Sequence, residues 1–276
     1  MPDQLRLSLA FVVVIVAAAM PARAADPPRA AGTALCAPIG MAASPLPTFS
    51  RLATLDDRAL AMFALPFARM AMNVRELADN DVRADGYQRG PNSPELFQAF
   101  DPPARLAAGL AGFFGGTFVH CASGTIVAVY RSTSPYDPRD WFAGIARYTG
   151  GGYSDLALRF FDAVAARFPG HPIVVVGHSS GGGLASYVAG QRSAPSVVFN
   201  GTRSDAAVTN PGGAQLAIII AGDPIADPVE ASARRDGAPQ PALNGTVLRL
   251  TPVEDYNGWV RHWIATVISE LERLIE

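Results

Sequence analysis

The chain has 276 residues, of which 49% are hydrophobic and 17% charged, and its formal net charge is −2. This apolar fraction is sufficient for a packed core and excludes an intrinsically disordered chain. The near-zero net charge argues against a general nucleic-acid-binding protein.

The N-terminus has the pattern of a secretory signal peptide. Arg6 precedes an apolar run over 7–20, in which Ser8 is the one polar residue, and Ala22-Arg23-Ala24 then places small residues at the two positions that a signal peptidase recognises. The run is short for a membrane span, which needs about 20 residues; a retained anchor is the alternative. We therefore expect residues 1–24 to be removed and the protein to be periplasmic or secreted. Residues 25–50 are rich in Pro, Ala and Ser, which indicates an irregular leader, and residues 51–276 are expected to form one domain.

Export makes disulfide formation possible, and the chain has two cysteines, Cys36 and Cys121. One bridge between them is the most that the chain can form alone. Two buried or free thiols are the alternative.

The first half of the domain reads as a helix, a loop and a hairpin. Apolar residues recur at helical spacing over 55–79, where Pro66 is expected to kink the helix or split it in two. Residues 80–103 are polar and contain several prolines, which indicates a loop. Two β-runs at 117–121 and 125–130 flank a short turn with a glycine, which predicts a hairpin.

The second half alternates strands with helices. Short apolar runs predict strands at 172–176, 196–199, 216–220 and 246–250. Helical patterns lie between and after them: one with Ser154 as its N-cap, one after the Gly-rich turn at 177–183, and a closing helix over 259–274. This order predicts an α/β fold in which a mostly parallel central sheet carries helices on both faces.

The sharpest motif is Gly177-His178-Ser179-Ser180-Gly181, which follows a buried strand and precedes a helix. That context is typical of a nucleophile elbow, in which the serine occupies a strained turn above the edge of the sheet. Gly177 and Gly181 suit the close approach of strand and helix. A phosphate-binding turn is the alternative, but the chain has no Lys for a P-loop.

A nucleophilic serine needs a base, and the base needs an acid that orients it. In α/β-hydrolases the order along the chain is Ser, acid, His. His262 is the only histidine after the last predicted strand, and it falls outside the Trp259–Trp263–Val267 stripe of the closing helix. Of the others, His120 lies in the hairpin, His171 in a tight turn, and His178 inside the elbow, where its side chain is expected to point away from the serine. We therefore expect His262 to be the base; a surface histidine that caps a helix is the alternative.

Asp223 directly follows a predicted strand and its glycine, so we favour it as the acid, with Asp227 as runner-up. Glu254 and Asp255 are too close to His262 in sequence to be favoured. An oxyanion hole needs two backbone N–H donors. Ser180, next to the nucleophile, and Thr133, after an early strand, are the candidates.

These stretches together resemble the class 3 (fungal-type) lipases of the α/β-hydrolase superfamily, over about residues 55–276. Members carry an early strand ending in an aromatic residue, Arg-Gly-Thr or Arg-Gly-Ser, a later Trp, a Gly-His-Ser-Leu-Gly-Gly elbow, an Asp after a later strand, and a late His. The matching stretches here are 125–133, Asp140-Trp141, 174–185, 218–223 and His262.

The resemblance implies that Ser179, Asp223 and His262 are the triad, that Thr133 gives the oxyanion an N–H and a hydroxyl, and that the loop around Trp141 is a lid. Two positions depart from the family: Ser132 replaces a Gly and Ser180 replaces a Leu. Because the loop at 131–141 is short and polar, an esterase of modest acyl chains is favoured over a true lipase.

The function expected is therefore hydrolysis of carboxylic esters, including lipid esters, through an acyl-enzyme, with no metal and no organic cofactor. A non-catalytic ester-binding protein, an acyltransferase and a thioesterase are the alternatives. Aromatic residues could make a transient contact with a membrane surface, although core packing is the commoner role for such residues: Phe113, Phe114, Trp141 and Phe142. The sequence leaves the oligomeric state open.

Overall fold

The computed structural model describes residues 49–76, 86–132, 152–202, 214–227 and 245–276. The described residues all belong to one compact unit, Leu35–Glu276. The predicted signal peptide and nearly all of the predicted leader lie outside the described residues, as do Cys36, Thr133, Trp141 and Phe142.

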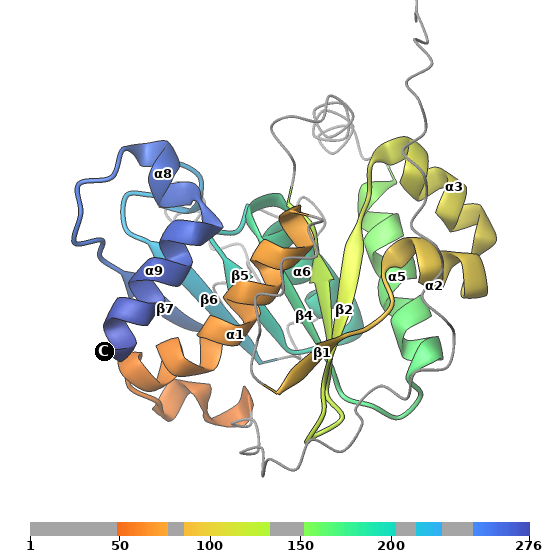
Figure 1. Ribbon diagram of the computed structural model, residues 1–276, viewed down its shortest axis with the longest axis horizontal. Helices are drawn as coiled ribbons and strands as arrows, with labels where there is room; N and C mark the ends of the chain where they lie inside the picture. Colours follow the sequence, from red (N-terminus) through yellow and green to blue (C-terminus); the bar gives the residue numbers. More distant parts are fainter. Residues whose placement is uncertain (1–48, 77–85, 133–151, 203–213, 228–244) are drawn as a thin grey trace, which may run out of the picture. The chain divides into compact units, whose positions relative to one another are not determined.

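The described strands form a seven-stranded sheet whose order in space follows the order in sequence (Figure 1). The strands are β1 (Tyr87–Arg89), β2 (Gly115–His120), β3 (Ile126–Tyr130), β4 (Ile173–His178), β5 (Ser196–Phe199), β6 (Gln215–Ile220) and β7 (Thr246–Leu250). β1, β2 and β3 pair antiparallel, which confirms the predicted hairpin. All pairs from β3 to β7 are parallel, so the carboxyl ends of five strands meet at one edge.

Helices cover both faces of this sheet. On one face lie α1 (Asp57–Glu76) and α9 (Ile264–Ile275), which pack next to each other (Figure 1). On the other lie α2 (Ser93–Phe100), α3 (Pro102–Ala111), α5 (Tyr153–Arg167) and α6 (Ser179–Arg192). Neighbouring residues of β4 show the alternation: Val174 and Val176 join the core under α1 and α9, and Val175 joins the core under α5 and α6. The predicted α/β fold, a mostly parallel central sheet with helices on both faces, is confirmed.

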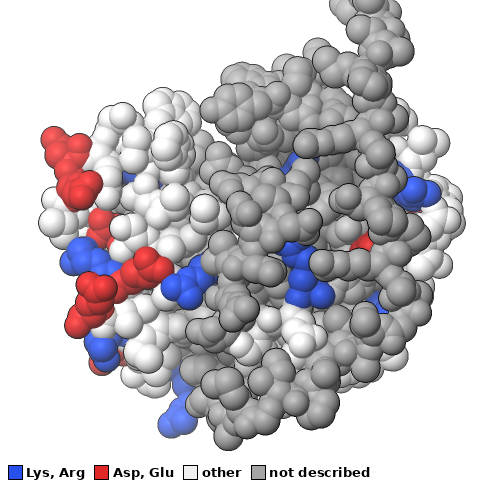
Figure 2. Space-filling model, in the orientation of Figure 1, with Lys and Arg blue, Asp and Glu red and all other residues white. Residues whose placement is uncertain are grey.

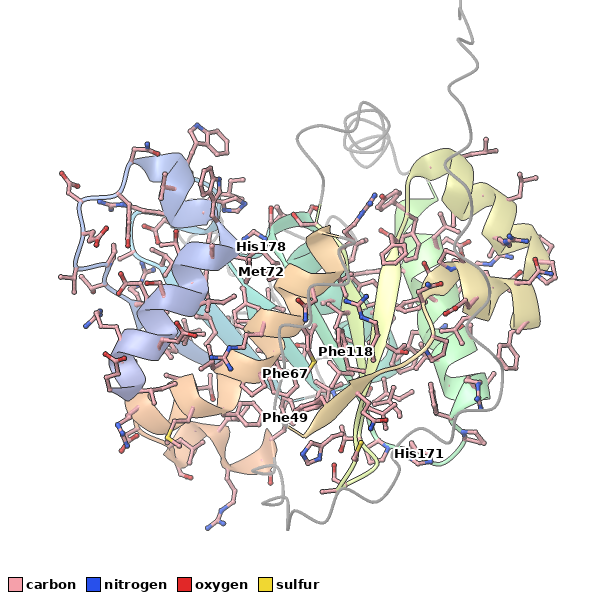
Figure 3. All side chains as sticks on the ribbon, in the orientation of Figure 1. Phe49, Phe67, Met72, Phe118, His171 and His178 are labelled. Carbon is pink, nitrogen blue, oxygen red and sulfur yellow. The ribbon has the colours of Figure 1, made fainter. Side chains whose placement is uncertain are left out.

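Four local predictions were wrong in whole or in part. Of the kink and the split predicted at Pro66, the split is excluded, because α1 runs through this residue. The fully buried Ala64, Phe67 and Ala68 hold both halves of α1 in the core, and Figure 3 shows Phe67 on this helix. The predicted loop at 80–103 contains β1 and α2. Asn92 caps α2 in a capping box with Glu95, a signal that the sequence does contain.

The third error concerns α5, which begins at Tyr153 after Gly152, so Ser154 is not its cap. The ring of Tyr153 packs edge-on against that of Phe113, with centroids 5.6 Å apart, and this contact stabilises the start of the helix at Tyr153.

The fourth concerns the closing helix, which is two helices. α8 (Gly258–His262) is followed by Trp263, whose extended backbone (ψ 140°) separates it from α9. The predicted apolar stripe of Trp259, Trp263 and Val267 does not form, since Trp259 and Trp263 are 66% and 51% exposed while His262 is buried.

Two further features of the described residues bear on function. None of their helices is both long and apolar enough to pass through a lipid bilayer. On the described part of the face in Figure 2, acidic and basic side chains lie interspersed, as in the ion pair of Arg69 with Glu272 at 2.8 Å.

Candidate active site

The turn between β4 and α6 has the backbone of a nucleophile elbow. β4 ends at His178 and α6 begins at Ser179, whose φ of +53° lies in the left-handed region that a non-glycine residue rarely adopts. A Cβ atom at Gly177 would come 2.1 Å from the carbonyl oxygen of Gly181, and one at Gly181 would come 2.2 Å from that of Tyr130. Glycine is therefore required at both positions that the motif supplied.

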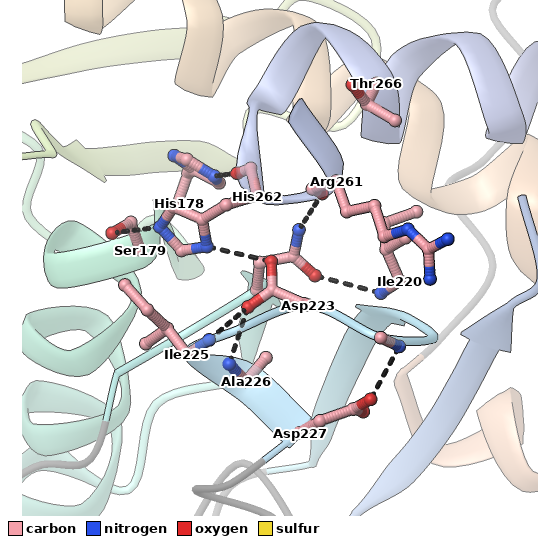
Figure 4. A network of polar contacts seen from close by, with 12 residues as sticks. His178, Ser179, Ile220, Asp223, Ile225, Ala226, Asp227, Arg261, His262 and Thr266 are labelled. Carbon is pink, nitrogen blue, oxygen red and sulfur yellow. Dashed lines mark hydrogen bonds and ion pairs between the residues drawn. The ribbon is translucent and has the colours of Figure 1, made fainter. Parts of the chain in front are cut away.

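A chain of hydrogen bonds joins the three predicted residues of the triad (Figure 4). The Ser179 hydroxyl lies 2.7 Å from Nε2 of His262, and Nδ1 of His262 lies 2.8 Å from Oδ2 of Asp223. A carboxylate only accepts, so Nδ1 carries the proton and Nε2 is left to accept from the serine. All three side chains are buried, which strengthens their mutual polar interactions.

Asp223 is the least exposed of the three, at 1%. Its second oxygen, Oδ1, accepts backbone N–H groups from Ile225 at 2.8 Å and Ala226 at 2.6 Å. These bonds compensate the burial of the charge and aim Oδ2 at His262.

The runner-up acid, Asp227, is engaged elsewhere. Its Oδ2 accepts the N–H of Gly222 at 2.6 Å, and its Oδ1 pairs with Arg249 of β7 at 2.6 Å. Asp223 rather than Asp227 therefore lies against His262.

Sequence reasoning missed Arg261, which connects the acid loop to the base. Its guanidinium donates to the carbonyl of Ala221 at 3.2 Å and to that of Tyr256 at 2.8 Å. It also lies 3.3 Å from the exposed Asp255. No local pattern marks this residue: Tyr256 and Asp255 lie close to it in sequence, but Ala221 is brought to it only by the packing of α8 on the end of β6.

The other histidines lie away from the serine hydroxyl. His120, in the hairpin, accepts from the N–H of Ser123 at 3.3 Å, and burial lowers its pKa. His171 donates from Nδ1 to the carbonyl of Gly124 at 2.7 Å. Figure 3 places His171 and His178 at opposite ends of β4. The side chain of His178 donates from Nε2 to the backbone carbonyl of His262, away from the nucleophile as predicted.

The predicted oxyanion hole is described in part. Ser180 lies in the first turn of α6, where helix N–H groups have no intrahelical acceptor. Thr133 lies outside the described residues. The chain leading to it is fixed: the buried Tyr130 donates its hydroxyl to the carbonyl of Ala157 at 3.1 Å, and burial keeps its pKa well above the ordinary value.

The aromatic residues and cysteines singled out in the sequence are described only in part. Phe113 is buried among Phe97, Tyr130 and Phe160 and therefore does not face a membrane; Phe114 is partly buried. Cys121 is disulfide-bonded. Its predicted partner, Cys36, is not among the described residues. Within the described part of the chain, no group of three or more His, Cys, Asp or Glu is placed to hold a metal.

No protein-family model matches the sequence, and no curated protein matches it. Solved structures of fungal lipases match the fold. A lipase from Rhizopus microsporus var. chinensis is 14% identical over 61% of this chain and 68% of its own, with a TM-score of 0.41. A Rhizomucor miehei lipase–propeptide complex is 13% identical over 60% and 61%, with a TM-score of 0.40.

A mono- and diacylglycerol lipase from Aspergillus oryzae is 16% identical over 63% of this chain and 74% of its own, with a TM-score of 0.36. All three are fungal lipases, the group that the motifs resemble. At these values the likeness carries no argument about activity, which must come from the geometry of the site.

Proposed function

We propose that the chain is a serine hydrolase that cleaves carboxylic esters, of the lipase or esterase class. The observation that carries the proposal is the continuous hydrogen-bonded chain from Ser179 through His262 to the buried Asp223. His262 lies 2.7 Å from the nucleophile on one side and 2.8 Å from the orienting acid on the other, as acyl transfer requires.

In the proposed reaction Ser179 Oγ attacks the ester carbonyl while Nε2 of His262 takes its proton. Asp223 stabilises the imidazolium that forms. The oxyanion develops beside the N-terminus of α6, where N–H groups and the helix dipole favour negative charge; the expected donors are the N–H groups of Ser180 and Thr133.

His262 then protonates the leaving alcohol, and the acyl group stays on Ser179. A water molecule gives a proton to His262 and attacks the acyl-enzyme. Collapse of the second tetrahedral intermediate returns that proton to Ser179 Oγ and releases the carboxylic acid.

The proposed substrates are lipid or other carboxylic esters, and the proposed site of action is the periplasm or the exterior of the cell. The disulfide at Cys121 supports export, because disulfides persist in oxidising compartments. The preference for short over long acyl chains, expected from the short polar loop at 131–141, is part of the proposal.

Hydrolysis of p-nitrophenyl esters from acetyl to palmitoyl, with the full chain, tests the proposal. Ser179→Ala should lower kcat by on the order of 10⁶-fold. Ser186→Ala is a matched control on the same helix, since its buried hydroxyl has no hydrogen-bond partner among the described residues, and it should keep full activity. If the native protein hydrolyses none of these esters and does not react with a phosphonate, the proposal is wrong, and a non-catalytic ester-binding role replaces it.

A further inference from the structure

The base of the triad is carried by α8, a helix of only five residues. The last carbonyl groups of a helix lack the regular intrahelical donors and need other partners. Here three consecutive carbonyls receive side-chain donors, and that of Val260 also accepts the N–H of Trp263. Oγ1 of Thr266 donates to Val260 at 2.6 Å, Nδ2 of Asn200 to Arg261 at 3.0 Å, and Nε2 of His178 to His262 at 2.6 Å.

Two of these donors come from the ends of the strands around the nucleophile. His178 is the last residue of β4, directly before Ser179, and Asn200 directly follows β5. Both side chains are almost fully buried. Asn200 has a φ of +42°, in the left-handed region that asparagine tolerates better than most residues.

The contacts of Asn200 also determine which way its amide points. Oδ1 accepts the N–H of Ile220, the last residue of β6, at 2.9 Å, and Nδ2 donates to α8. One side chain therefore connects the strand that leads to Asp223 with the helix that carries His262.

Apolar burial does little to hold α8 in place. Trp259 is 66% exposed, and Val260 and Arg261 are only half-buried. The rings of His178 and His262 lie against each other with centroids 5.1 Å apart. Directional hydrogen bonds are thus what determines where the imidazole of His262 stands.

We propose that His178 and Asn200 are positioning residues, which hold the backbone of His262 so that its Nε2 stays within hydrogen-bond reach of Ser179. This inference rests on the proposed function and deepens it. The positioning role explains why His178 occupies the second position of the elbow. Its ring is long enough to reach across the edge of the sheet and donate to the backbone carbonyl of His262.

The test compares two substitutions of His178 in the full chain. His178→Gln keeps an N–H donor at about the reach of Nε2, whereas His178→Met keeps the length and removes the donor. Because a displacement of about 1 Å can cost roughly 10²-fold in rate, we expect kcat of His178→Met to fall about 10²-fold with KM little changed. We expect His178→Gln to recover at least about tenfold of that loss.

His171→Met is the matched control. It removes an analogous histidine–carbonyl hydrogen bond, to Gly124, at the other end of β4, and it should leave kcat unchanged. Asn200→Asp, which keeps the acceptor for Ile220 and removes the donor to Arg261, should show the same loss of kcat at constant KM. It serves as the second variant if His178→Met does not fold.

A spectroscopic signature separates positioning from a general loss of structure. The downfield proton resonance between His262 Nδ1 and Asp223 should persist in His178→Gln and His171→Met and broaden or vanish in His178→Met. The proposal is overturned if His178→Met keeps native kcat and this resonance, or if His171→Met loses as much kcat. If the native protein hydrolyses no ester, the proposed function fails, while the resonance still tests whether His178 holds the base.

Discussion

The two closing helices, α8 and α9, adjoin in sequence but are held in different ways. α9 presents an apolar face, with Val267 and Leu271 fully buried, that packs along α1 and the sheet. α8 exposes Trp259 and is held mainly through its backbone, by donors from three other elements. Burial is non-directional and supplies stability, whereas hydrogen bonds specify where an atom stands. The comparison indicates that stability resides in α9 and the placement of the base in α8.

Among the substitutions that test this comparison, Asp223→Asn should have the largest effect on activity. The new amide keeps an acceptor for Ile225 and Ala226 but turns a donor toward Nδ1 of His262, which forces the wrong tautomer. We expect kcat/KM to fall roughly 10⁴-fold, measured on the best p-nitrophenyl ester, with the melting temperature nearly unchanged. Asp227→Asn, the control, should stay within a few-fold of the native rate. A greater loss in Asp227→Asn would reverse the assignment of the acid.

Leu271→Ala on α9 should lower the stability of the protein and leave its activity unchanged. Truncating this fully buried side chain removes packing against α1 and leaves a cavity, which should cost about 2–5 kcal/mol of unfolding free energy. Urea denaturation measures the loss, and kcat per folded molecule should stay native. Leu106→Ala, at a 70% exposed position on α3, should change stability by less than about 0.5 kcal/mol. A large drop in kcat of folded Leu271→Ala would show that α9 also positions the base.

Thr266→Val tests the junction between the two helices and should have the smallest effect. It removes the hydroxyl that donates to Val260, but this carbonyl keeps the N–H of Trp263 at 3.1 Å. We expect a loss of about 1 kcal/mol in thermal unfolding and a fall in kcat of less than tenfold. Thr266→Ser, which keeps the hydroxyl, should restore both. Native kcat and stability in Thr266→Val would mean that this third donor is dispensable.

The sequence alone was enough to predict strands β2 to β7, the hairpin, the elbow and the order of Ser179, Asp223 and His262. These features are local: a strand depends on neighbouring apolar residues, and the elbow on glycines that cannot carry a Cβ at 2.1–2.2 Å from a backbone oxygen. The capping box of α2 is equally local, so the start of that helix is also encoded in the sequence.

Tertiary structure decided which polar groups meet. Asp223 and Asp227 lie four residues apart, and their roles differ because Asp223 faces His262 of α8 while Asp227 pairs with Arg249 of β7. The roles of His178, Asn200 and Arg261 likewise depend on partners 40 to 84 residues away along the chain. Side-chain hydrogen bonds of such range leave no periodicity in a sequence, because register and packing alone determine which strand ends and helix ends come together at the edge of the sheet.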